Sequence, residues 1–399
     1  MQLHRLASAT GAILLGAGVV LAAQPAAQAA FPGGNGLVAF VSTRAGSDTI
    51  FVVNPEAAGI GNGTSDPANT QQLTGGYSPA DAEQGVDSEP FFSPNGAMVT
   101  FASDRNGNYQ IFTIPVSDAG NLNSDGSDNA TLVSQAPTDT GDDDYAPSFS
   151  PDGCTIVFNR GNSALYTVNS CATNPASTVT LLLTVSLVSN SGTDGSDSRA
   201  LFDPVDPTKL IYVGNNNHIY ELTDVGTPTF NPSQTPIDLS AASGVGSAAD
   251  ADPDWSPDGT QILFDSTRGG SLHQIWAMTS SGSAAAQVYT STASDTQPVF
   301  SPDGTKIAFT EPGQSQDVAD EAVMPVSMSG GLDHGSGTPT DVTLVGAGKS
   351  GPVDSQPDWQ PVPGSSAVLP EAPYAILLPG GALLIMGLAL ALKRRRQLS

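Results

Sequence analysis

The chain repeats one short pattern, Pro-x-Phe/Trp-Ser-Pro-Asp/Asn-Gly, four times along its 399 residues, and two reduced copies fill the remaining places. The aromatic residue of the six copies is, in order, Phe92, Phe149, Phe202, Trp255, Phe300 and Trp359. Neighbouring copies are therefore 45 to 59 residues apart. A period of this length indicates an array of similar supersecondary units.

Each repeat contains the elements of a four-stranded antiparallel sheet. After Trp255, the Ser256-Pro257-Asp258-Gly259 stretch predicts a tight turn, because Pro presets φ and Gly accepts a positive φ. Strands are predicted at 260–265, 274–278 and 286–290, where β-branched and aromatic residues lie between turns of small residues. Together with the segment before the turn, these strands make four per repeat.

The two ends of the array complete one repeat between them. Residues 32–54 have the pattern of a repeat without its first strand, and residues 357–361 have the pattern of a first strand with no successor. We therefore predict an all-β fold, a six-bladed β-propeller of four-stranded antiparallel blades. Its ring is closed by N- and C-terminal strands that share one blade, which hides the sheet edges.

These repeats resemble those of the TolB-type six-bladed β-propellers. The resemblance rests on the repeated pattern, on turns such as Ser103-Asp104-Arg105 and on the outer-strand ending Gln72-Leu73-Thr74, and it spans residues 32–361. It implies the propeller fold. By analogy it also implies a scaffold that binds a protein or peptide, although related propellers gate serine peptidases or act as enzymes.

The N-terminal segment is typical of a secretory signal peptide at 1–29. It has a weakly basic start, an apolar stretch and the small-residue pattern Ala27-Gln28-Ala29. The propeller domain is predicted at 31–362. We therefore expect the mature protein outside the cytoplasm.

The C-terminal segment has the three parts of an anchor. Residues 363–373 form a linker with the sequence LPEAP, residues 374–392 form an apolar run of 19 residues, and residues 393–399 are basic. Such a run is long enough to span a bilayer, with the basic end in the cytoplasm. The linker is similar to a bacterial sorting motif, but Ala372-Pro373 replaces Thr-Gly. Covalent attachment to the wall and a plain membrane anchor therefore both remain open.

The formal net charge of −26 makes nucleic acid an unfavourable partner and favours a cation or a basic protein surface. Solubility outside the cell is the simpler explanation of the same charge. A monomer is expected.

One Asp stands three residues before the Pro position of every repeat. These residues are Asp87, Asp144, Asp197, Asp250, Asp295 and Asp354. One carboxylate per blade, at the start of the innermost strand, predicts a negative ring at one mouth of the central channel. Such a ring would attract calcium or a basic peptide. Alternatively, each Asp accepts hydrogen bonds within its own turn.

A second, weaker calcium candidate consists of Asn121, Asn123 and Asp125, whose oxygens alternate before Gly126. Leu132 stands where a bidentate Glu is required, so a solvated turn is the alternative.

The two cysteines, Cys154 and Cys171, flank a predicted hairpin that turns near Gly161-Asn162. In that hairpin the two residues lie opposite each other, within disulfide reach, and we expect a disulfide between them.

No catalytic residue is predicted. The chain has no G-x-S-x-G elbow, and His218, His273 and His334 lie in different repeats without ligand spacing. The alternative to a binding scaffold is a metal-dependent carbohydrate-active enzyme, a lyase or hydrolase, that uses the same channel mouth.

Overall fold

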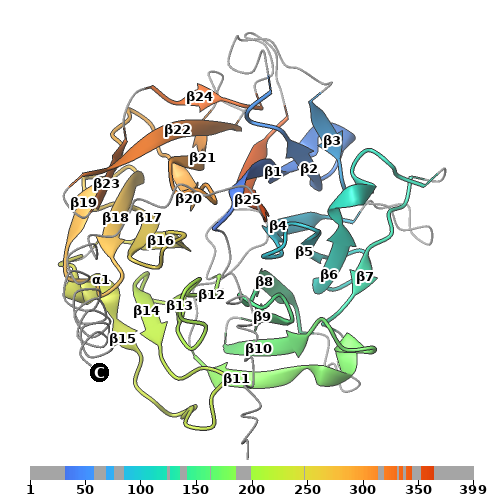
Figure 1. Ribbon diagram of the computed structural model, residues 1–399, viewed down its shortest axis with the longest axis horizontal. Helices are drawn as coiled ribbons and strands as arrows, with labels where there is room; N and C mark the ends of the chain where they lie inside the picture. The colour runs from blue at the N-terminus through green and yellow to red at the C-terminus, as the bar shows by residue number, and fades with distance from the viewer. Residues whose placement is uncertain are drawn as a thin grey trace, which may run out of the picture.

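The structure is a computed structural model in which six antiparallel sheets surround a central axis as a six-bladed propeller (Figure 1). The described residues are 32–57, 69–75, 85–123, 126–134, 142–161, 163–185, 199–246, 248–312, 319–329, 332–335, 338–343 and 352–363. Apart from short 3₁₀ turns (Thr43–Ala45, Val116–Asp118 and Pro175–Thr178), their one helix is α1 (Leu239–Ala242). The predicted all-β propeller is confirmed.

Five blades have four strands each. In blades 2 to 5 the strands follow one another in sequence, and in blade 1 the last strand of the chain precedes the first three. Blade 1 contains β25 (Asp354–Val362), β1 (Gly34–Ser42), β2 (Thr49–Val53) and β3 (Thr70–Gln72). Blade 2 contains β4 (Asp87–Phe92), β5 (Met98–Ser103), β6 (Gln110–Pro115) and β7 (Thr131–Leu132). Blade 3 contains β8 (Asp144–Phe149), β9 (Thr155–Arg160), β10 (Ala164–Asn169) and β11 (Thr180–Thr184). Blade 4 contains β12 (Leu201–Phe202), β13 (Leu210–Val213), β14 (Ile219–Leu222) and β15 (Ile237–Asp238). Blade 5 contains β16 (Asp250–Trp255), β17 (Gln261–Ser266), β18 (Gln274–Thr279) and β19 (Ala285–Gln287).

Blade 6 departs from this plan at its outer edge. It contains β20 (Thr296–Phe300), β21 (Lys306–Pro312), β22 (Ala319–Ser329), β23 (Leu332–Gly335) and β24 (Thr340–Asp341). The repeat plan predicts one outer strand, but the long β22 pairs with β23 along its second half and with β24 along its first.

The repeated motif builds the turn between the first two strands of a blade. In blade 5, Ser256 Oγ donates to Asp258 Oδ1 at 2.7 Å and accepts from Gln261 N at 2.9 Å. Gly259 completes the turn at φ 68°, where a side chain is disfavoured. The motif therefore specifies a reversal of the chain.

The ring closes where β25 pairs with β1, at opposite ends of the chain (Figure 1). Trp359 lies opposite Val38 and is 2% exposed, packed in a cluster with Phe40 and Val299. The predicted sharing of one blade by the two ends is confirmed.

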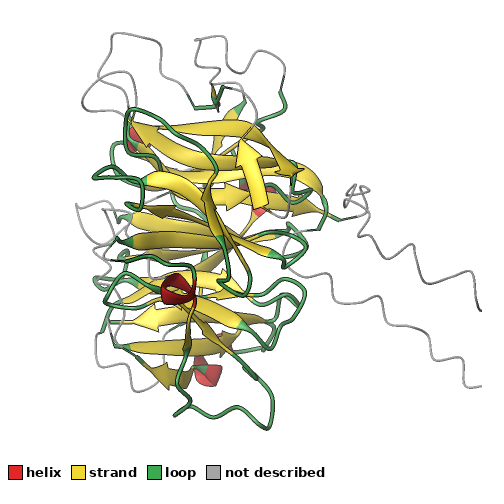
Figure 2. Cartoon of the chain, turned by 90° about the vertical axis from the view of Figure 1, so that its left-hand side faces the viewer, coloured by secondary structure: helices red, strands yellow, loops and turns green. Residues whose placement is uncertain are grey.

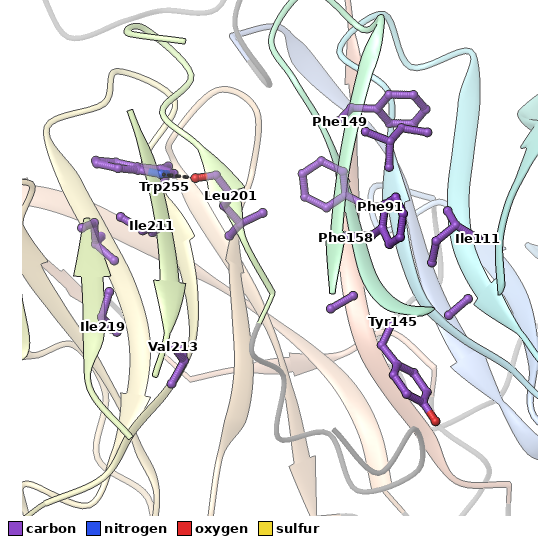
Figure 3. Packing of buried hydrophobic residues seen from close by; sticks show 14 of the residues in the cluster. Phe91, Ile111, Tyr145, Phe149, Phe158, Leu201, Ile211, Val213, Ile219 and Trp255 are labelled. Carbon is purple, nitrogen blue, oxygen red and sulfur yellow. Dashed lines mark hydrogen bonds between the residues drawn. The ribbon is translucent and has the colours of Figure 1, made fainter. Parts of the chain in front are cut away.

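Between other blades, the same aromatic position fills the interface. Trp255 is 1% exposed and donates from its indole nitrogen to Leu201 O at 3.3 Å in the neighbouring blade (Figure 3). The aromatic residues of the motif thus bury apolar area between blades, which is the main driving force for assembling the ring.

The predicted disulfide joins Cys154 to Cys171, whose Cα atoms lie 5.0 Å apart. The ladder pairs Thr155 with Asn169, and Ser170 N donates to Cys154 O at 2.9 Å. Cys154 therefore lies opposite Ser170, one residue from the register predicted from the sequence, and the bridge runs diagonally just beyond the ladder.

Replacing both cysteines by serine should lower the free energy of unfolding by about 3 kcal/mol, because the bridge closes a short loop in the unfolded chain. Urea denaturation with and without dithiothreitol checks this. The double variant should be insensitive to the reductant, and a wild-type curve that dithiothreitol leaves unchanged would contradict the expectation.

Residues 1–31 and 364–399, which hold the predicted signal peptide, apolar run and basic tail, lie outside the described residues. Within the part of the chain that is described, no helix has the length and apolar character needed to cross a membrane.

Candidate functional site

The first strand of each blade runs from one face of the ring to the other, so the two faces carry different residues. We call the face where the first strands begin the Asp face, and the opposite one, with the Ser-Pro-Asp-Gly turns, the turn face. Viewed from the side, the ring has loops on both faces (Figure 2). The predicted ring of carboxylates belongs to the Asp face.

Four of the six predicted Asp residues are fully buried, and each forms an ion pair with an arginine of its own blade. The pairs are Asp87 with Arg105 at 2.9 Å, Asp144 with Arg160 at 2.7 Å, Asp354 with Arg44 at 2.5 Å, and Asp250 with Arg268, whose Nε lies 3.0 Å from Oδ1. Asp295 is 1% exposed and is described below, and Asp197 lies outside the described residues.

Three of these arginines also lie over aromatic rings of both the second and the third strand, and Arg268 lies over the second-strand ring of Phe264. The Arg105 guanidinium carbon is 5.1 Å from the Phe101 ring centre and 4.8 Å from that of Phe112. Arg160 lies in the same way over Phe158 and Tyr166. A buried carboxylate, a guanidinium and aromatic rings therefore form one repeated structural unit.

Burial raises the pKa of Asp87, and the nearby Arg105 guanidinium opposes that rise. Burial likewise raises the pKa of Asp354, to about 6, against the effect of Arg44. In these blades an arginine of the same blade neutralises the charge of the buried carboxylate. A signal for these pairs is present in the sequence, since Arg44, Arg105 and Arg268 each follow a Ser by two residues, but that pattern by itself predicts only a turn.

The residue before the Pro of the first strand has an unusual backbone conformation. This residue adopts a left-handed conformation in five blades, at Glu89, Ala146, Asp252, Gln297 and Gln356, with φ between 46° and 59°. Each such bulge costs about 1 kcal/mol for a residue other than Gly. The hydrogen bonds described next offset that cost.

These bulges join neighbouring blades around the channel. Gln356 N donates to Gln297 Oε1 at 2.9 Å, Glu89 N donates to Gln356 Oε1 at 2.7 Å, and Ala146 N donates to Glu89 Oε2. The cavity beside them is only about 20 Å³ in volume. That is room for about one or two water molecules.

Two further carboxyl groups, Asp254 and Asp358, lie deeper in the channel wall. They accept from Phe300 N at 2.8 Å and from Phe92 N at 2.6 Å in the neighbouring blades. Burial raises the pKa of Asp254 to about 7 and that of Asp358 to about 8, although the Arg199 guanidinium lowers both. Their role in the structure is to join blades.

The raised pKa of Asp358 makes stability depend on pH. The folded protein retains a proton that the unfolded chain releases, so the free energy of unfolding should fall as pH rises from the ordinary pKa of 3.8 to about 8. Over that window, one such proton contributes a slope of about 1.4 kcal/mol per pH unit.

Asp358→Asn imitates the protonated acid and should flatten the pH profile between pH 5 and pH 8, as measured by urea denaturation across about that range. Asp152→Asn, which removes an exposed carboxylate on the turn face, should keep the wild-type slope. Equal slopes for wild type and Asp358→Asn would argue against the assignment.

At the channel mouth, two tyrosines lie among carboxylates on the Asp face. The Tyr109 and Tyr145 ring centres are 4.8 Å apart, and Asp143 Oδ1 accepts from Tyr109 N at 3.0 Å. Figure 3 shows Tyr145 at the other end of its strand from Phe149. Burial raises the pKa of both tyrosines, and Asp104 beside Tyr109 adds to it. We call Asp48, Asp104, Tyr109, Asp143 and Tyr145 the mouth patch.

The weaker calcium candidate has its amide groups occupied within the loop. Asn121 Nδ2 donates to Ala119 O at 3.1 Å and Asn123 Nδ2 donates to Ser127 Oγ at 3.0 Å, while Asp125 is outside the described residues. Across the described part of the chain, no three acidic, His or Cys side chains are grouped so that they could hold a metal ion.

Two histidines are bound to carboxylates. His218 Nδ1 lies 2.9 Å from Asp238 Oδ2, and His273 Nδ1 contacts Asp265 Oδ1. The hydrogen bond to Asp265 raises the pKa of His273, against the effect of its burial. The side chain of His334 is not described. The described geometry therefore gives His218 and His273 no shared site.

Comparison with known proteins supports the fold. The family described as TolB beta propeller domain matches residues 242–339. The structure of TolB from Acinetobacter baumannii is similar over 83% of this chain and 68% of its own, at 16% identity and a TM-score of 0.56. Hydrazine synthase of Kuenenia stuttgartiensis is similar over 85% of this chain and 48% of its own, at 11% identity and a TM-score of 0.51.

An oligogalacturonate lyase from Vibrio parahaemolyticus matches 75% of this chain and 72% of its own at 12% identity, but its TM-score of 0.41 carries no argument. No curated protein matches the sequence. The chain is thus a six-bladed β-propeller whose fold is similar to that of TolB and whose residues 242–339 match the TolB propeller family.

Proposed function

We propose that this propeller is a protein-binding scaffold whose Asp face receives a protein or peptide that carries positive charge. The observation behind the proposal is how the basic residues are used. The Asp-face arginines are committed to buried carboxylates of their own blades, namely Arg44, Arg105, Arg160 and Arg268. Of the other described basic residues, Arg199 lines the channel, and Lys209 and Lys306 stand where second strands begin, at the turn face.

The three carboxylates of the mouth patch are half-buried, and none of them forms an ion pair with a described cation. Opposite charge around a surface speeds the encounter with a basic partner and disfavours acidic ones. The tyrosine pair adds aromatic area of the kind that anchors protein interfaces. Similarity to TolB supports a scaffold in general and names no partner for this chain.

We also propose that the scaffold works outside the cytoplasm, tethered to a bacterial membrane or wall. The basis is the sequence of residues 1–29 and 363–399 alone. Protease treatment of intact cells tests it, since an external domain should be digested while a cytoplasmic marker survives. The rival function, a metal-dependent carbohydrate-active enzyme, has no specific observation in its favour.

The binding proposal is tested with a defined probe, a fluorescent peptide of alternating lysine and glycine. The triple variant Asp48→Asn, Asp104→Asn, Asp143→Asn should weaken binding about ten-fold or more, because three opposing charges are lost while the amide oxygens still cap their turns. The matched control removes three charges from the turn face, with Asp152→Asn, Asp258→Asn and Asp303→Asn. Equal loss in both variants would mean that net charge, and not the Asp face, attracts the peptide.

A further inference from the structure

Blade 6 lacks the arginine that four other blades place on their buried Asp. Its first-strand carboxylate, Asp295, is 1% exposed, and its second-strand ring, Phe309, is fully buried, as in those blades. Thr296 pairs with Thr310, so by continuation Asp295 lies opposite Glu311. In blade 3 that opposite position holds Arg160, which pairs with Asp144. Blade 6 thus has a carboxylate where the third blade has a guanidinium.

The nearby sequence does not supply a substitute. In blade 2 the arginine comes two residues after Ser103, which lies opposite Asp87, but two residues after Glu311 comes Gly313. Residues 313–318, Gly-Gln-Ser-Gln-Asp-Val, contain no basic residue. Among the described residues, Arg44 is the cation that acts on Asp320; its Nη2 binds Asp354 at 2.5 Å, and its Nη1 is buried without a hydrogen-bond partner.

Blade 6 also has aromatic rings beside its buried Asp, but one of them comes from the neighbouring blade. The third-strand partner of Phe309 is Ala322, whereas Phe101 of blade 2 faces Phe112. Tyr289 from blade 5 stands beside Phe309 instead, with ring centres 5.8 Å apart. The charges of Asp295 and Glu311 act on the Tyr289 hydroxyl and, after burial, raise its pKa. We call Tyr289, Asp295, Phe309, Glu311 and Asp320 the blade 6 slot.

Buried oxygen atoms of the slot lack partners. Within the described part of the chain, Asp295 Oδ2 and Asp320 Oδ1 accept no hydrogen bond, although these residues are only 1% and 3% exposed. Asp320 faces Glu311 across the β21–β22 ladder. Asp87 Oδ2 and Asp354 Oδ1 also accept no hydrogen bond, but an arginine binds the other oxygen of each of these two carboxylates, whereas Asp295 has no described arginine. A buried carboxylate without a cation is costly, which indicates that a positively charged donor is missing.

The protonation of the slot agrees with a missing positive charge. Burial raises the pKa of Asp295 and that of Asp320 to about 6, and with Asp341 it raises the pKa of Glu311 to about 9. Glu311 and Asp341 are half-buried, so the cluster reaches the surface.

We propose that the blade 6 slot receives the guanidinium group of an arginine supplied by a protein partner. Four sister blades show that a guanidinium fits between a first-strand carboxylate and an aromatic ring in this fold. A planar cation forms paired hydrogen bonds with carboxylates and stacks on a ring, which a compact ammonium group does less well. The inference rests on the proposed protein-binding function and names the chemistry of one contact.

The test uses the full chain and N-acetyl-arginine amide as the probe, with the citrulline and lysine analogues for comparison, followed by calorimetry at about pH 8, where Asp295 and Asp320 are ionised. The arginine probe should bind at least about ten-fold more tightly than the uncharged citrulline analogue. Asp295→Asn should remove the difference, and Asp303→Asn, which removes a carboxylate from the turn face of the same blade, should keep it. Equal binding of the arginine and citrulline probes by wild type would overturn the proposal.

Glu311→Arg provides the second variant, because it places a guanidinium where blade 3 has Arg160. It should fill the slot from within, abolish binding of the arginine probe and raise the melting temperature. A variant that melts higher yet still binds the probe would also overturn the proposal. So would binding that occurs only after Lys349→Gln, since the chain's own Lys349 would then be the occupant.

The two proposals fail separately. If the mouth-patch variant loses the lysine peptide while Glu311→Arg leaves the arginine probe bound, the scaffold proposal stands and the slot is wrong. If the slot variants lose the arginine probe while the mouth patch leaves the lysine peptide bound, the slot stands and the wider acidic face does not.

Discussion

Arg268→Met should lower the free energy of unfolding by about 3 to 5 kcal/mol, because it leaves the Asp250 carboxylate buried without its ion-pair partner. Asp250 is fully buried, and after the loss of Arg268 it would retain the hydroxyls of Ser240 and Ser266 at 2.7 and 2.6 Å as its partners. Two hydroxyl donors do not compensate for a buried charge. Urea denaturation measures the loss.

Two controls separate the buried charge from the loss of side-chain volume. The double variant Asp250→Asn, Arg268→Met should recover part of the stability, because no charge remains buried. Lys306→Met breaks an ion pair with Glu56, whose side chains are 28% and 48% exposed, and should cost less than about 1 kcal/mol. A single variant as mild as Lys306→Met would mean that the Asp and Arg unit contributes little.

Trp359→Ala should cost about 3 to 5 kcal/mol, since it empties a fully packed position in the blade that closes the ring. The loss should also loosen the pairing of β25 with β1, because no covalent turn joins these two strands. Urea denaturation gives the energy, and hydrogen exchange of the Val38 to Val41 amides reports on the closure.

Trp255→Ala is the matched control, because it deletes the same side chain from the equivalent strand of a blade that is continuous in sequence. It should destabilise the protein to a similar degree while β1 stays protected. Equal exchange of β1 in the two variants would show that the closing blade is no weaker than the others.

Much of the fold follows from residues that act on their neighbours in sequence. The Ser-Pro-Asp-Gly turns form by local hydrogen bonds, such as those of Ser256 and Asp258, and so they repeat wherever the motif repeats. The same repetition indicated six blades and closure by the two ends. The disulfide followed from the hairpin around Gly161, with a register error of one residue.

The outer strands were less predictable. Blade 6 has two short strands, β23 and β24, beyond its third strand, and the helix α1 follows β15, because the outer edge of a blade has few partners and depends on local packing.

The candidate site, too, was predictable from the sequence only in part. The repeat spacing located one Asp per blade without any structure, because the register of the strands carries each residue to an equivalent place. It left open whether those carboxylates bind a ligand or other parts of the protein, since the answer depends on which cation folding brings near. The tertiary structure pairs Asp87, Asp144, Asp250 and Asp354 with arginines that come from the next strand or turn.

The left-handed conformation of the residue before the Pro could not be predicted from the sequence either. It depends on hydrogen bonds between blades, such as the one from Glu89 N to Gln356 Oε1. Asp295 shows the difference most clearly. By sequence it is one of six equal residues, and the packed structure buries it without the arginine that four of the others have. Local chemistry thus determined the blades and their number, whereas contacts between distant residues decided which carboxylates are neutralised.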